Sequence, residues 1–158
     1  RESLFNLIAH GGYGEPAPPE GARVLDLFAG TGALGLEALS RGALSVTFVD
    51  NGAKARGILA MNIARLRAEG ETSVLARDAT RLGRNVEAPF DLVFVDPPYG
   101  KGLGEASLGA ALAGGWVADG ALVIWEESVT PRPPSGLTLR DSRRYGDTMI
   151  SIFRVTRS

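Results

Sequence analysis

Short apolar strands alternate with helical segments through most of this chain, and this alternation constrains its fold more than any other feature. Five segments have the apolar, β-branched character of buried strands, and they span residues 23–28, 45–49, 72–76, 91–95 and 121–126. A helical segment follows each of the first four, over residues 33–40, 53–68, 80–86 and 105–113. Strands joined by helices form right-handed crossovers, so we expect a mainly parallel sheet with helices on both faces.

The two ends of the chain have a different pattern. Residues 1–10 predict a short helix that glycines 11 and 12 end, and a connector rich in proline and glycine follows over residues 13–21. Residues 137–145 and 148–155 alternate in polarity around a Gly-Asp turn, which is typical of an antiparallel hairpin. The sequence therefore predicts one α/β domain with a seven-stranded, mainly parallel, Rossmann-like sheet and a terminal antiparallel hairpin.

The predicted core comes from the strands and from one face of each helix. In the longest helix, residues 53–68, we expect one apolar face and one basic face. The apolar face comprises Ile58, Met61, Ile63 and Leu66, and the basic face comprises Arg56, Arg65 and Arg67. Trp116 follows a helix and Trp125 lies in a strand, and we expect both in the core.

Composition excludes several kinds of chemistry. The chain of 158 residues contains no cysteine and a single histidine, His10. Disulfides, zinc–thiolate sites, iron–sulfur clusters and cysteine nucleophiles are therefore excluded, and a histidine-based metal site or Ser-His-Asp triad is not expected. No apolar run reaches the roughly 18 residues of a membrane-spanning helix, and we expect a cytoplasmic monomer. Catalysis must then use carboxylates, backbone groups, aromatic rings or a bound cofactor, without a metal.

A glycine-rich loop follows the first predicted strand. Residues 30–35 read GTGALG and fit G-x-G-x-x-G, and Asp50 lies 20 positions after Gly30, at the end of the second predicted strand. Glycines allow a tight turn and a close approach to a ligand, while a carboxylate at the next strand end accepts hydrogen bonds from ribose hydroxyls. The pattern predicts a nucleoside cofactor, but it does not separate a nicotinamide dinucleotide from S-adenosylmethionine.

Three features favour S-adenosylmethionine. The alternating sheet leaves no second region for a hydride acceptor, and the terminal hairpin resembles the methyltransferase variant of the Rossmann sheet. Acids also lie in or near the ends of strands one to four, at Asp26, Asp50, Asp78 and Asp96. They predict an electronegative cleft at the carboxyl edge of the sheet, which suits a sulfonium better than a pyrophosphate. The candidate cofactor-binding residues are Asp26, Phe28, Gly30, Gly32, Asp50, Asn51, Asp78 and Ala79.

The tetrapeptide Asp96-Pro97-Pro98-Tyr99 follows the fourth predicted strand and therefore lies at the same edge as the glycine loop. An exocyclic amine on a nucleobase is a poor nucleophile because its lone pair is delocalised into the ring. The Asp96 carboxylate and the Pro97 carbonyl can accept its two hydrogens and direct the lone pair toward a methyl donor, and Tyr99 offers a ring for base stacking. The four residues are the candidate catalytic residues; the alternative is a Pro-Pro turn that ends a strand.

Basic residues near the tetrapeptide and in the hairpin are candidates for contacts with nucleic acid. Lys101 comes shortly after the tetrapeptide, while a basic cluster with an aromatic residue is formed by Arg140, Arg143, Arg144 and Tyr145. A solvated hairpin face explains this cluster equally well. The net charge of −1 becomes +3 for the rest of the chain if the four cleft acids face a cofactor. A basic surface near the cleft would then support a nucleic-acid partner.

Three blocks of the sequence resemble the RsmD family. Residues 1–6 read RESLFN, residues 26–43 read DLFAGTGALGLEALSRGA and residues 96–99 read DPPY. That family methylates the N2 amine of a guanine in small-subunit ribosomal RNA, so the resemblance implies this activity, S-adenosylmethionine as cofactor, and ribosomal RNA or an assembling small subunit as partner. It also implies catalysis by residues 96–99 and cofactor binding by the Gly30 loop, Asp50, Asp78 and Ala79.

The sequence departs from the family pattern in two places. Family members usually carry Glu at the position of Asp50, which makes the expected ribose contact one methylene shorter. A basic, glycine-rich hairpin that precedes the first helix in the family is absent from this sequence, and such a hairpin would be a natural RNA contact.

The residues alone leave other functions open. Adenine-N6 methylation of DNA uses the same tetrapeptide, although no residues remain for a target-recognition region. A protein glutamine methyltransferase would resemble Asn-Pro-Pro-Tyr rather than carry Asp96 at the first position. A non-catalytic nucleoside-binding module is the third alternative. Asp26 could also be a satisfied structural carboxylate, and Asp78 a helix cap.

Overall fold

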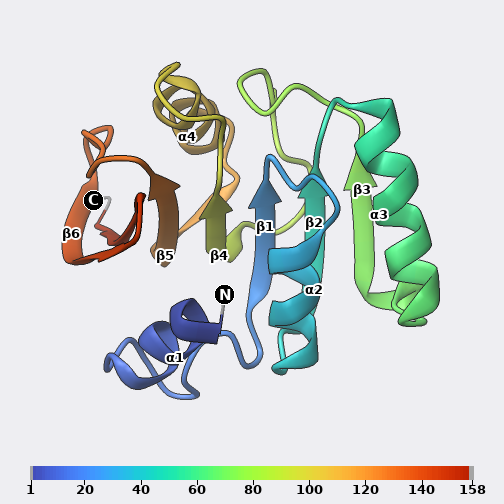
Figure 1. Ribbon diagram of the computed structural model, residues 1–158, viewed down its shortest axis with the longest axis horizontal. Coiled ribbons are helices and arrows are strands. Elements are labelled where there is room, and N and C mark those ends of the chain that lie inside the picture. The colour runs from blue at the N-terminus through green and yellow to red at the C-terminus, as the bar shows by residue number, and fades with distance from the viewer. Residues whose placement is uncertain (1, 157–158) are drawn as a thin grey trace.

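Seven strands form one sheet through the centre of the structure (Figure 1). The computed structural model describes residues 2–156. The strands are β1 (Arg23–Leu27), β2 (Ser45–Val49), β3 (Thr72–Leu75), β4 (Phe90–Val95), β5 (Val117–Glu127), β6 (Leu137–Tyr145) and β7 (Thr148–Val155). Their order across the sheet is β3-β2-β1-β4-β5-β7-β6.

The first five strands run parallel, and the last two form a hairpin. β3, β2, β1, β4 and β5 pair in parallel, while β7 lies antiparallel between β5 and β6. The carboxyl ends of the five parallel strands therefore share one edge of the sheet, where ligands bind in such folds. The predicted seven-stranded, mainly parallel α/β sheet with a terminal antiparallel hairpin is confirmed.

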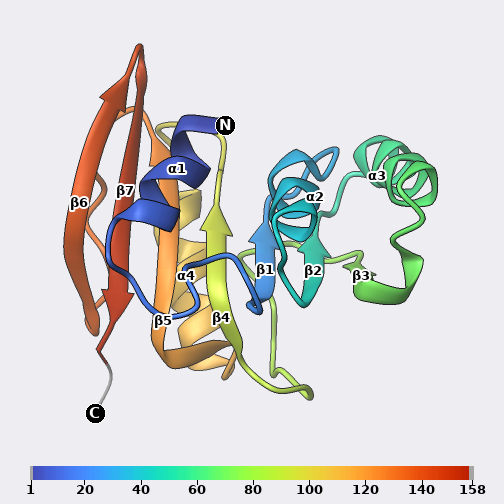
Figure 2. The same ribbon diagram turned by 90° about the horizontal axis from the view of Figure 1, so that it is seen from below.

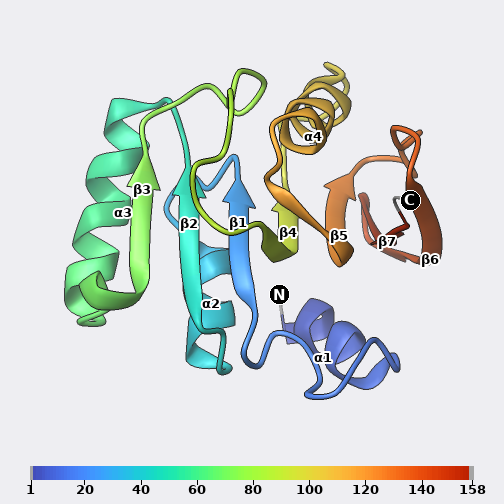
Figure 3. The same cartoon turned by 180° about the vertical axis from the view of Figure 1, so that it is seen from behind.

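Helices cover the two faces of the sheet unequally (Figure 2). α1 (Glu2–His10), α2 (Ala33–Ser40) and α3 (Ala53–Arg65) lie on one face, α4 (Leu103–Ala113) lies on the other, and a short 3-10 helix, η1 (Glu69–Glu71), precedes β3. On the face of α4, the chain between β3 and β4 crosses in front of β1 and β2 (Figure 3). The predicted first helix is confirmed from Glu2 onward, and Arg1 lies outside the described residues. Within residues 2–156, none of the helices is long and apolar enough to cross a bilayer.

Two apolar cores form because successive residues of a strand point to opposite faces. On β4, for example, Phe94 packs with the core beneath α1, α2 and α3, whereas Val95 packs with the core beneath α4. The predicted core tryptophans, Trp116 and Trp125, are both buried in the second core. The sheet is thus held rigidly from both sides, and its carboxyl edge is a fixed platform for side chains.

The predicted helix over residues 80–86 is wrong. Gly83 has a left-handed backbone with φ 71°, and its carbonyl accepts a hydrogen bond from the Trp116 indole at 2.9 Å. The Asn85 backbone amide donates to the Gly114 carbonyl at 2.9 Å, and its side-chain amide donates to the Glu87 carbonyl at 3.0 Å. These partners replace the hydrogen bonds of a helical turn. The segment is therefore a loop held against the turn that follows α4.

The predicted apolar face over residues 53–68 is also largely wrong. α3 ends at Arg65, and its buried residues are Leu59 and Ile63. Three residues of the predicted face are exposed instead: Ile58, Met61 and Leu66. α3 stands beside β3, an edge strand of four residues, so the sheet beneath this helix is too narrow to cover a wide apolar face (Figure 1).

The predicted basic face of α3 is confirmed in part. Arg65 and Arg67 are exposed, but Arg56 is half-buried. The Arg56 guanidinium donates to the Asp50 backbone carbonyl at 3.3 Å, which draws this side chain toward the end of β2.

Candidate active site

A cavity of about 390 Å³ lies at the carboxyl ends of β1, β4 and β5. Asp26 and Phe28 contribute the wall at the end of β1, Gly30 contributes the loop that follows, and Asp96 contributes the end of β4. Leu4 of α1 and Ile150 of β7 close it on the side of the hairpin. The cavity therefore joins the glycine loop to the first residue of the Asp-Pro-Pro-Tyr element.

A second cavity, of about 230 Å³, adjoins the first at Phe28, which lines both. It is lined on the side of β2 and β3 by Asp50, Asn51, Asp78 and Ala79. Phe28 has φ 59°, a left-handed conformation that is costly for a residue with a side chain and that occurs most often at functional sites. Seven of the eight predicted cofactor-binding residues thus line two adjoining cavities.

Asp50 holds the glycine loop in place. One carboxylate oxygen accepts the Gly30 backbone amide at 2.8 Å, and the other accepts the Gly52 amide at 2.8 Å. These bonds tie the loop after β1 to the loop after β2. Gly30 has φ 59° with open space where a Cβ would lie, so bare backbone faces the cavity. Each carboxylate oxygen keeps a second lone pair, and the predicted ribose contact of Asp50 stays a prediction.

The later glycines of the loop allow close packing. A Cβ on Gly32 would collide with Leu59 of α3, and a Cβ on Gly35 would lie 2.5 Å from the ring of Phe48 on β2. Gly35 therefore lets α2 approach β2 closely, and Gly32 lets the start of α2 approach α3. The structure places Gly32, the eighth predicted cofactor residue, against α3.

Asp26 is a buried acid at the base of the larger cavity. Only 1% of the residue is exposed, and one carboxylate oxygen accepts the Gly35 amide at 3.0 Å. Burial raises the pKa of Asp26 to about 8; the Gly35 bond opposes this rise, and the nearby charges of Asp96 and Asp50 add to it. Asp26 is therefore a group that a cation entering the cavity would ionise.

Asp96 lies at the end of β4 and faces Glu126, which lies at the end of β5; both line the larger cavity. Burial raises the pKa of Asp96 to about 7, and a hydrogen bond with Glu126 and the charges of Glu126 and Glu127 add to the rise. Two carboxyl groups this close disfavour the state in which both are ionised. The pair therefore retains a proton near neutral pH and can accept one from a ligand after losing it.

The rest of the tetrapeptide turns away from β4. Pro97 is buried, while Pro98 lines the smaller cavity. Tyr99 is 41% exposed, and its hydroxyl lies 3.0 Å from the Thr148 hydroxyl at the start of β7. The hairpin thus anchors the Tyr99 side chain and leaves part of its ring open.

Asp78 caps a turn. One carboxylate oxygen accepts the Thr80 amide at 2.9 Å and the Thr80 hydroxyl at 2.7 Å, and both bonds lower the pKa of Asp78. No helix follows within this segment, so the helix-cap alternative is wrong. Asp78 is exposed and Ala79 is buried, and both border the smaller cavity.

The predicted nucleic-acid contacts lie in two places. Lys101 is exposed in the loop that precedes α4. Arg143 and Tyr145 line a separate hollow between α1 and β6, whereas Arg144, between them on the strand, points to the opposite face. Among residues 2–156, no three His, Asp or Glu side chains are arranged to hold a metal ion.

Glu126 is a site residue that the sequence reasoning missed. It is half-buried at the cavity wall opposite Asp96. One signal could have identified it: the acids at the ends of the first four strands continue onto the fifth, in the run Trp125-Glu126-Glu127.

Known proteins resemble this chain along its length. A family model described as Conserved hypothetical protein 95 matches residues 1–154. Ribosomal RNA small subunit methyltransferase D of Escherichia coli K12 is 35% identical over 157 residues, which cover 98% of this chain and 75% of that protein. The putative rRNA methyltransferase YlbH of Bacillus subtilis is 32% identical over 160 residues, covering 98% of this chain and 83% of that protein.

Solved structures also match this chain. The putative methyltransferase yhhF from Escherichia coli matches with a TM-score of 0.83 and 33% identity, covering 100% of this chain and 85% of that one. TrmN from Thermus thermophilus matches in fold, with a TM-score of 0.77 and 24% identity, covering 98% of this chain and 47% of that one. These matches and the strand order confirm the predicted Rossmann-like, class I methyltransferase fold. The chain belongs to the Conserved hypothetical protein 95 family, which is the RsmD family that its sequence resembles.

Proposed function

We propose that this protein transfers a methyl group from S-adenosylmethionine to the exocyclic N2 amine of a guanine in small-subunit ribosomal RNA. The observation that carries the proposal is the position of Asp96 and Glu126, whose carboxyl groups face the cavity that the glycine loop also lines. The names of the relatives supply the RNA class, since they act on small-subunit ribosomal RNA.

The residues of the two cavities fit the cofactor. Asp26 and Asp96 line the larger cavity as acids that an entering cation would ionise, which favours a sulfonium and an ammonium group there. When bound, S-adenosylmethionine supplies an activated methyl group on a positively charged sulfur. Asp26, Phe28 and Gly30 would hold its methionine part in the larger cavity. On the side of the smaller cavity, the nucleoside would be held by Asp50, Asn51, Asp78 and Ala79.

Asp96 and Pro97 would orient the amine. An ionised Asp96 carboxylate and the Pro97 carbonyl accept the two N–H groups, so the nitrogen lone pair points away from both acceptors and toward the methyl donor. The nitrogen gains the methyl group and loses one proton. Asp96 can accept that proton, because it already binds the amine and its pKa is raised to about 7. Tyr99, tied to Thr148, would stack on the target base.

Glu126 favours guanine over adenine as the target. In guanine two ring nitrogens flank the N2 amine, and one of them, N1, carries a hydrogen and donates. In adenine the N1 beside the N6 amine has no hydrogen and accepts. Once the pair has lost its proton, the Glu126 carboxylate next to Asp96 is an acceptor, so it can bind guanine N1–H but would repel adenine N1. An unmatched buried polar pair costs about 1–3 kcal/mol, which corresponds to roughly 5- to 150-fold in rate.

The proposal is tested with labelled S-adenosylmethionine and small ribosomal subunits from cells that lack the enzyme. After digestion to nucleosides, we expect the label in N2-methylguanosine. Label in N6-methyladenosine would favour the adenine alternative, and cofactor binding by calorimetry without any transfer would favour the non-catalytic module. The Asp96→Asn protein serves as the control, since it should bind cofactor and transfer no methyl group.

The role of Glu126 is tested with RNA in which 2-aminopurine replaces the target guanine. This base keeps the exocyclic amine but has no N1–H. We expect the wild-type protein to methylate the guanine RNA at least roughly fivefold faster. The Glu126→Gln protein, whose amide can either donate or accept, should reduce that ratio toward one. An unchanged ratio in the variant would remove Glu126 from base selection.

A further inference from the structure

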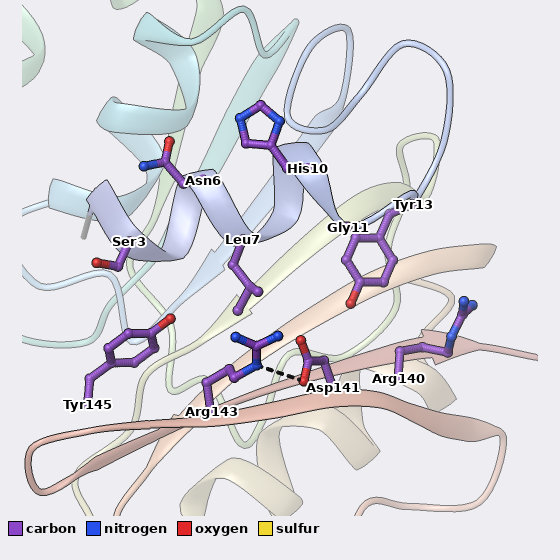
Figure 4. A pocket seen from close by; sticks show the side chains of 10 residues that line it. All are labelled: Ser3, Asn6, Leu7, His10, Gly11, Tyr13, Arg140, Asp141, Arg143 and Tyr145. Carbon is purple, nitrogen blue, oxygen red and sulfur yellow. Dashed lines mark hydrogen bonds and ion pairs between the residues drawn. The ribbon is translucent and has the colours of Figure 1, made fainter.

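A hollow of about 620 Å³ lies between α1 and β6, beside the active-site cavity (Figure 4). We call it the α1–β6 groove and define it by Ser3, Leu7, Tyr13, Arg140, Arg143 and Tyr145. The catalytic residues proposed above leave this groove without a function. Its lining combines two arginines with exposed aromatic surface, which is the composition of a site for nucleic-acid backbone and bases.

An irregularity in β6 brings the second arginine into the groove. The pairing of β6 with β7 shifts register between Leu139 and Asp141, so that Arg140 is the extra residue of a β-bulge. In a regular strand, neighbouring residues would point to opposite faces. Here Arg140 and Asp141 both line the groove, and Arg143 follows at the next position on the same side.

Arg143 is oriented for an anion. Its Nε donates to the Asp141 carboxylate at 3.2 Å, and the rest of its guanidinium points into the groove toward Leu7 (Figure 4). The side chain is 57% exposed, so the two terminal nitrogens are open to solvent. A guanidinium fixed through Nε presents those nitrogens as a fork that matches phosphate oxygens. The two arginines exceed the single acid of the groove by one charge.

Aromatic rings lie at the two ends of the groove. Tyr145 is 39% exposed beside Ser3, and its ring is open to a stacked base (Figure 4). At the other end, the Arg140 guanidinium lies 5.8 Å from the ring centre of Tyr13, which is only 9% exposed, so Tyr145 provides the stacking surface. The groove can therefore bind a phosphate and a base together. This favours RNA over an acidic peptide, since a peptide carboxylate needs no stacking surface.

The groove is continuous with the active site through the strands. Glu126 of β5 pairs with Ile150 of β7, and Ile150 pairs with Arg143 of β6. Strands lie about 4.8 Å apart, so Glu126 and Arg143 are separated by about 10 Å along this row. Tyr145 pairs with Thr148, whose hydroxyl contacts Tyr99. An RNA strand with its target base beside Glu126 would therefore pass its neighbouring nucleotides over the groove.

We propose that the α1–β6 groove binds the nucleotides that flank the target guanine, with Arg143 on a backbone phosphate and Tyr145 stacked on a base. This inference rests on the proposed function for the identity of the RNA. The groove also supplies a basic surface beside an acidic cleft, and so explains how a chain of net charge −1 engages RNA.

The test measures RNA binding and methyl transfer separately. The probe is a labelled single-stranded RNA of mixed sequence, and the transfer substrate is the small subunit lacking the modification. Arg143→Gln should weaken RNA binding roughly five- to tenfold and lower the slope of log affinity against log salt by about one. It should raise the KM for small subunits, with kcat and cofactor affinity unchanged. Arg143→Lys should restore the salt slope but only part of the affinity.

Arg65→Gln is the matched control, because it makes the same charge change at an exposed residue of α3, near the opposite edge of the sheet. Tyr145→Leu should weaken RNA binding, and Tyr145→Phe should not, because phenylalanine retains the stacking ring. Equal effects of Arg143→Gln and Arg65→Gln would overturn the inference. Competition by polyglutamate as effective as competition by RNA would also overturn it and indicate an acidic protein partner.

Failure of the groove and failure of the proposed function give different results. If no guanine is methylated but Arg143→Gln still weakens RNA binding, the RNA-binding role of the groove is supported and the proposed reaction is contradicted. If guanine is methylated and RNA binding is indifferent to Arg143 and Tyr145, only the groove is overturned.

Discussion

Asp26 makes the stability of this protein depend on pH in an unusual direction. The folded protein holds the Asp26 proton up to a pKa of about 8, against 3.8 for an ordinary aspartate. Between these values the unfolded chain binds fewer protons than the folded one, so stability falls as the pH rises through that window. The pKa of Asp26 differs by about four units between the folded and unfolded states. This difference lowers the unfolding free energy by about 6 kcal/mol in total, and the loss is complete above pH 8.

The Asp26→Asn substitution removes this dependence. Asparagine has the same shape, and its side-chain oxygen can still accept the Gly35 amide that bonds to Asp26 at 3.0 Å. Its amide does not ionise, so the substitution should stabilise the protein more at high pH than at low pH. Relative to wild type, the gain in unfolding free energy should be about 4 kcal/mol larger at pH 8.5 than at pH 5.

Urea unfolding of both proteins at the two pH values measures this difference. Asp78→Asn is the matched control, because the Thr80 bonds lower the pKa of this exposed carboxyl and its stabilising effect is lost only as the pH falls. An equal effect of Asp26→Asn at pH 5 and pH 8.5 would refute a protonated Asp26 in the folded protein. If Asp26→Asn instead lowered the unfolding free energy at pH 8.5 only, Asp26 would be ionised and paired in the folded wild-type protein.

Four further measurements probe the catalytic residues and the packing of the glycine loop and α4. The rate of methyl transfer should rise with pH through about 7, as Asp96 loses its proton, and a pH–rate profile without this limb would contradict the role of Asp96 as acceptor. Gly35→Ala should lower the unfolding free energy by about 1–3 kcal/mol, because the added methyl meets β2 side chains at 2.5 and 2.7 Å. Gly109→Ala, in α4 with open space around it, should instead raise it by roughly 0.5–1 kcal/mol in the same urea assay. Tyr99→Phe removes the 3.0 Å contact with Thr148 and should raise the KM for RNA while changing the unfolding free energy by less than about 1 kcal/mol; an unchanged KM would separate this contact from substrate binding.

The parallel strands and the terminal hairpin were predictable because each depends on a local pattern. Buried strands such as residues 45–49 are rich in apolar and β-branched residues, and the Gly-Asp turn at residues 146–147 separates two alternating strands. Residues 80–86 show the limit of this approach. Their helical pattern loses to hydrogen bonds with Trp116 and Gly114, which lie about 30 residues away.

The prediction of the apolar face of α3 was wrong for a similar reason. Periodicity predicts which residues share a side of a helix, but the width of the buried stripe depends on what lies beneath. Met61 is 62% exposed because α3 stands at the edge of the sheet, and the position of that edge is not written in residues 53–65.

The candidate site was predictable where it follows strand ends. The end of β1, the end of β2 and the end of β4 meet because the strands are parallel, which brings Asp26, Asp50 and Asp96 together. Glu126 was missed although it obeys the same rule, since it is the penultimate residue of β5. The role of Asp50 as a clamp on two backbone amides was also not predictable, because it depends on the path of two loops.

We propose above that this protein methylates N2 of a guanine in small-subunit ribosomal RNA, with Asp96 and Glu126 binding the target base. This proposal is tested most directly in cells that lack their own family member and express this chain, by mass spectrometry of nucleosides from their purified small-subunit RNA. We expect the wild-type chain to restore N2-methylguanosine and the Asp96→Asn chain, expressed to the same level, not to restore it. Restoration by both chains, or a gain of N6-methyladenosine in place of N2-methylguanosine, would contradict the proposal.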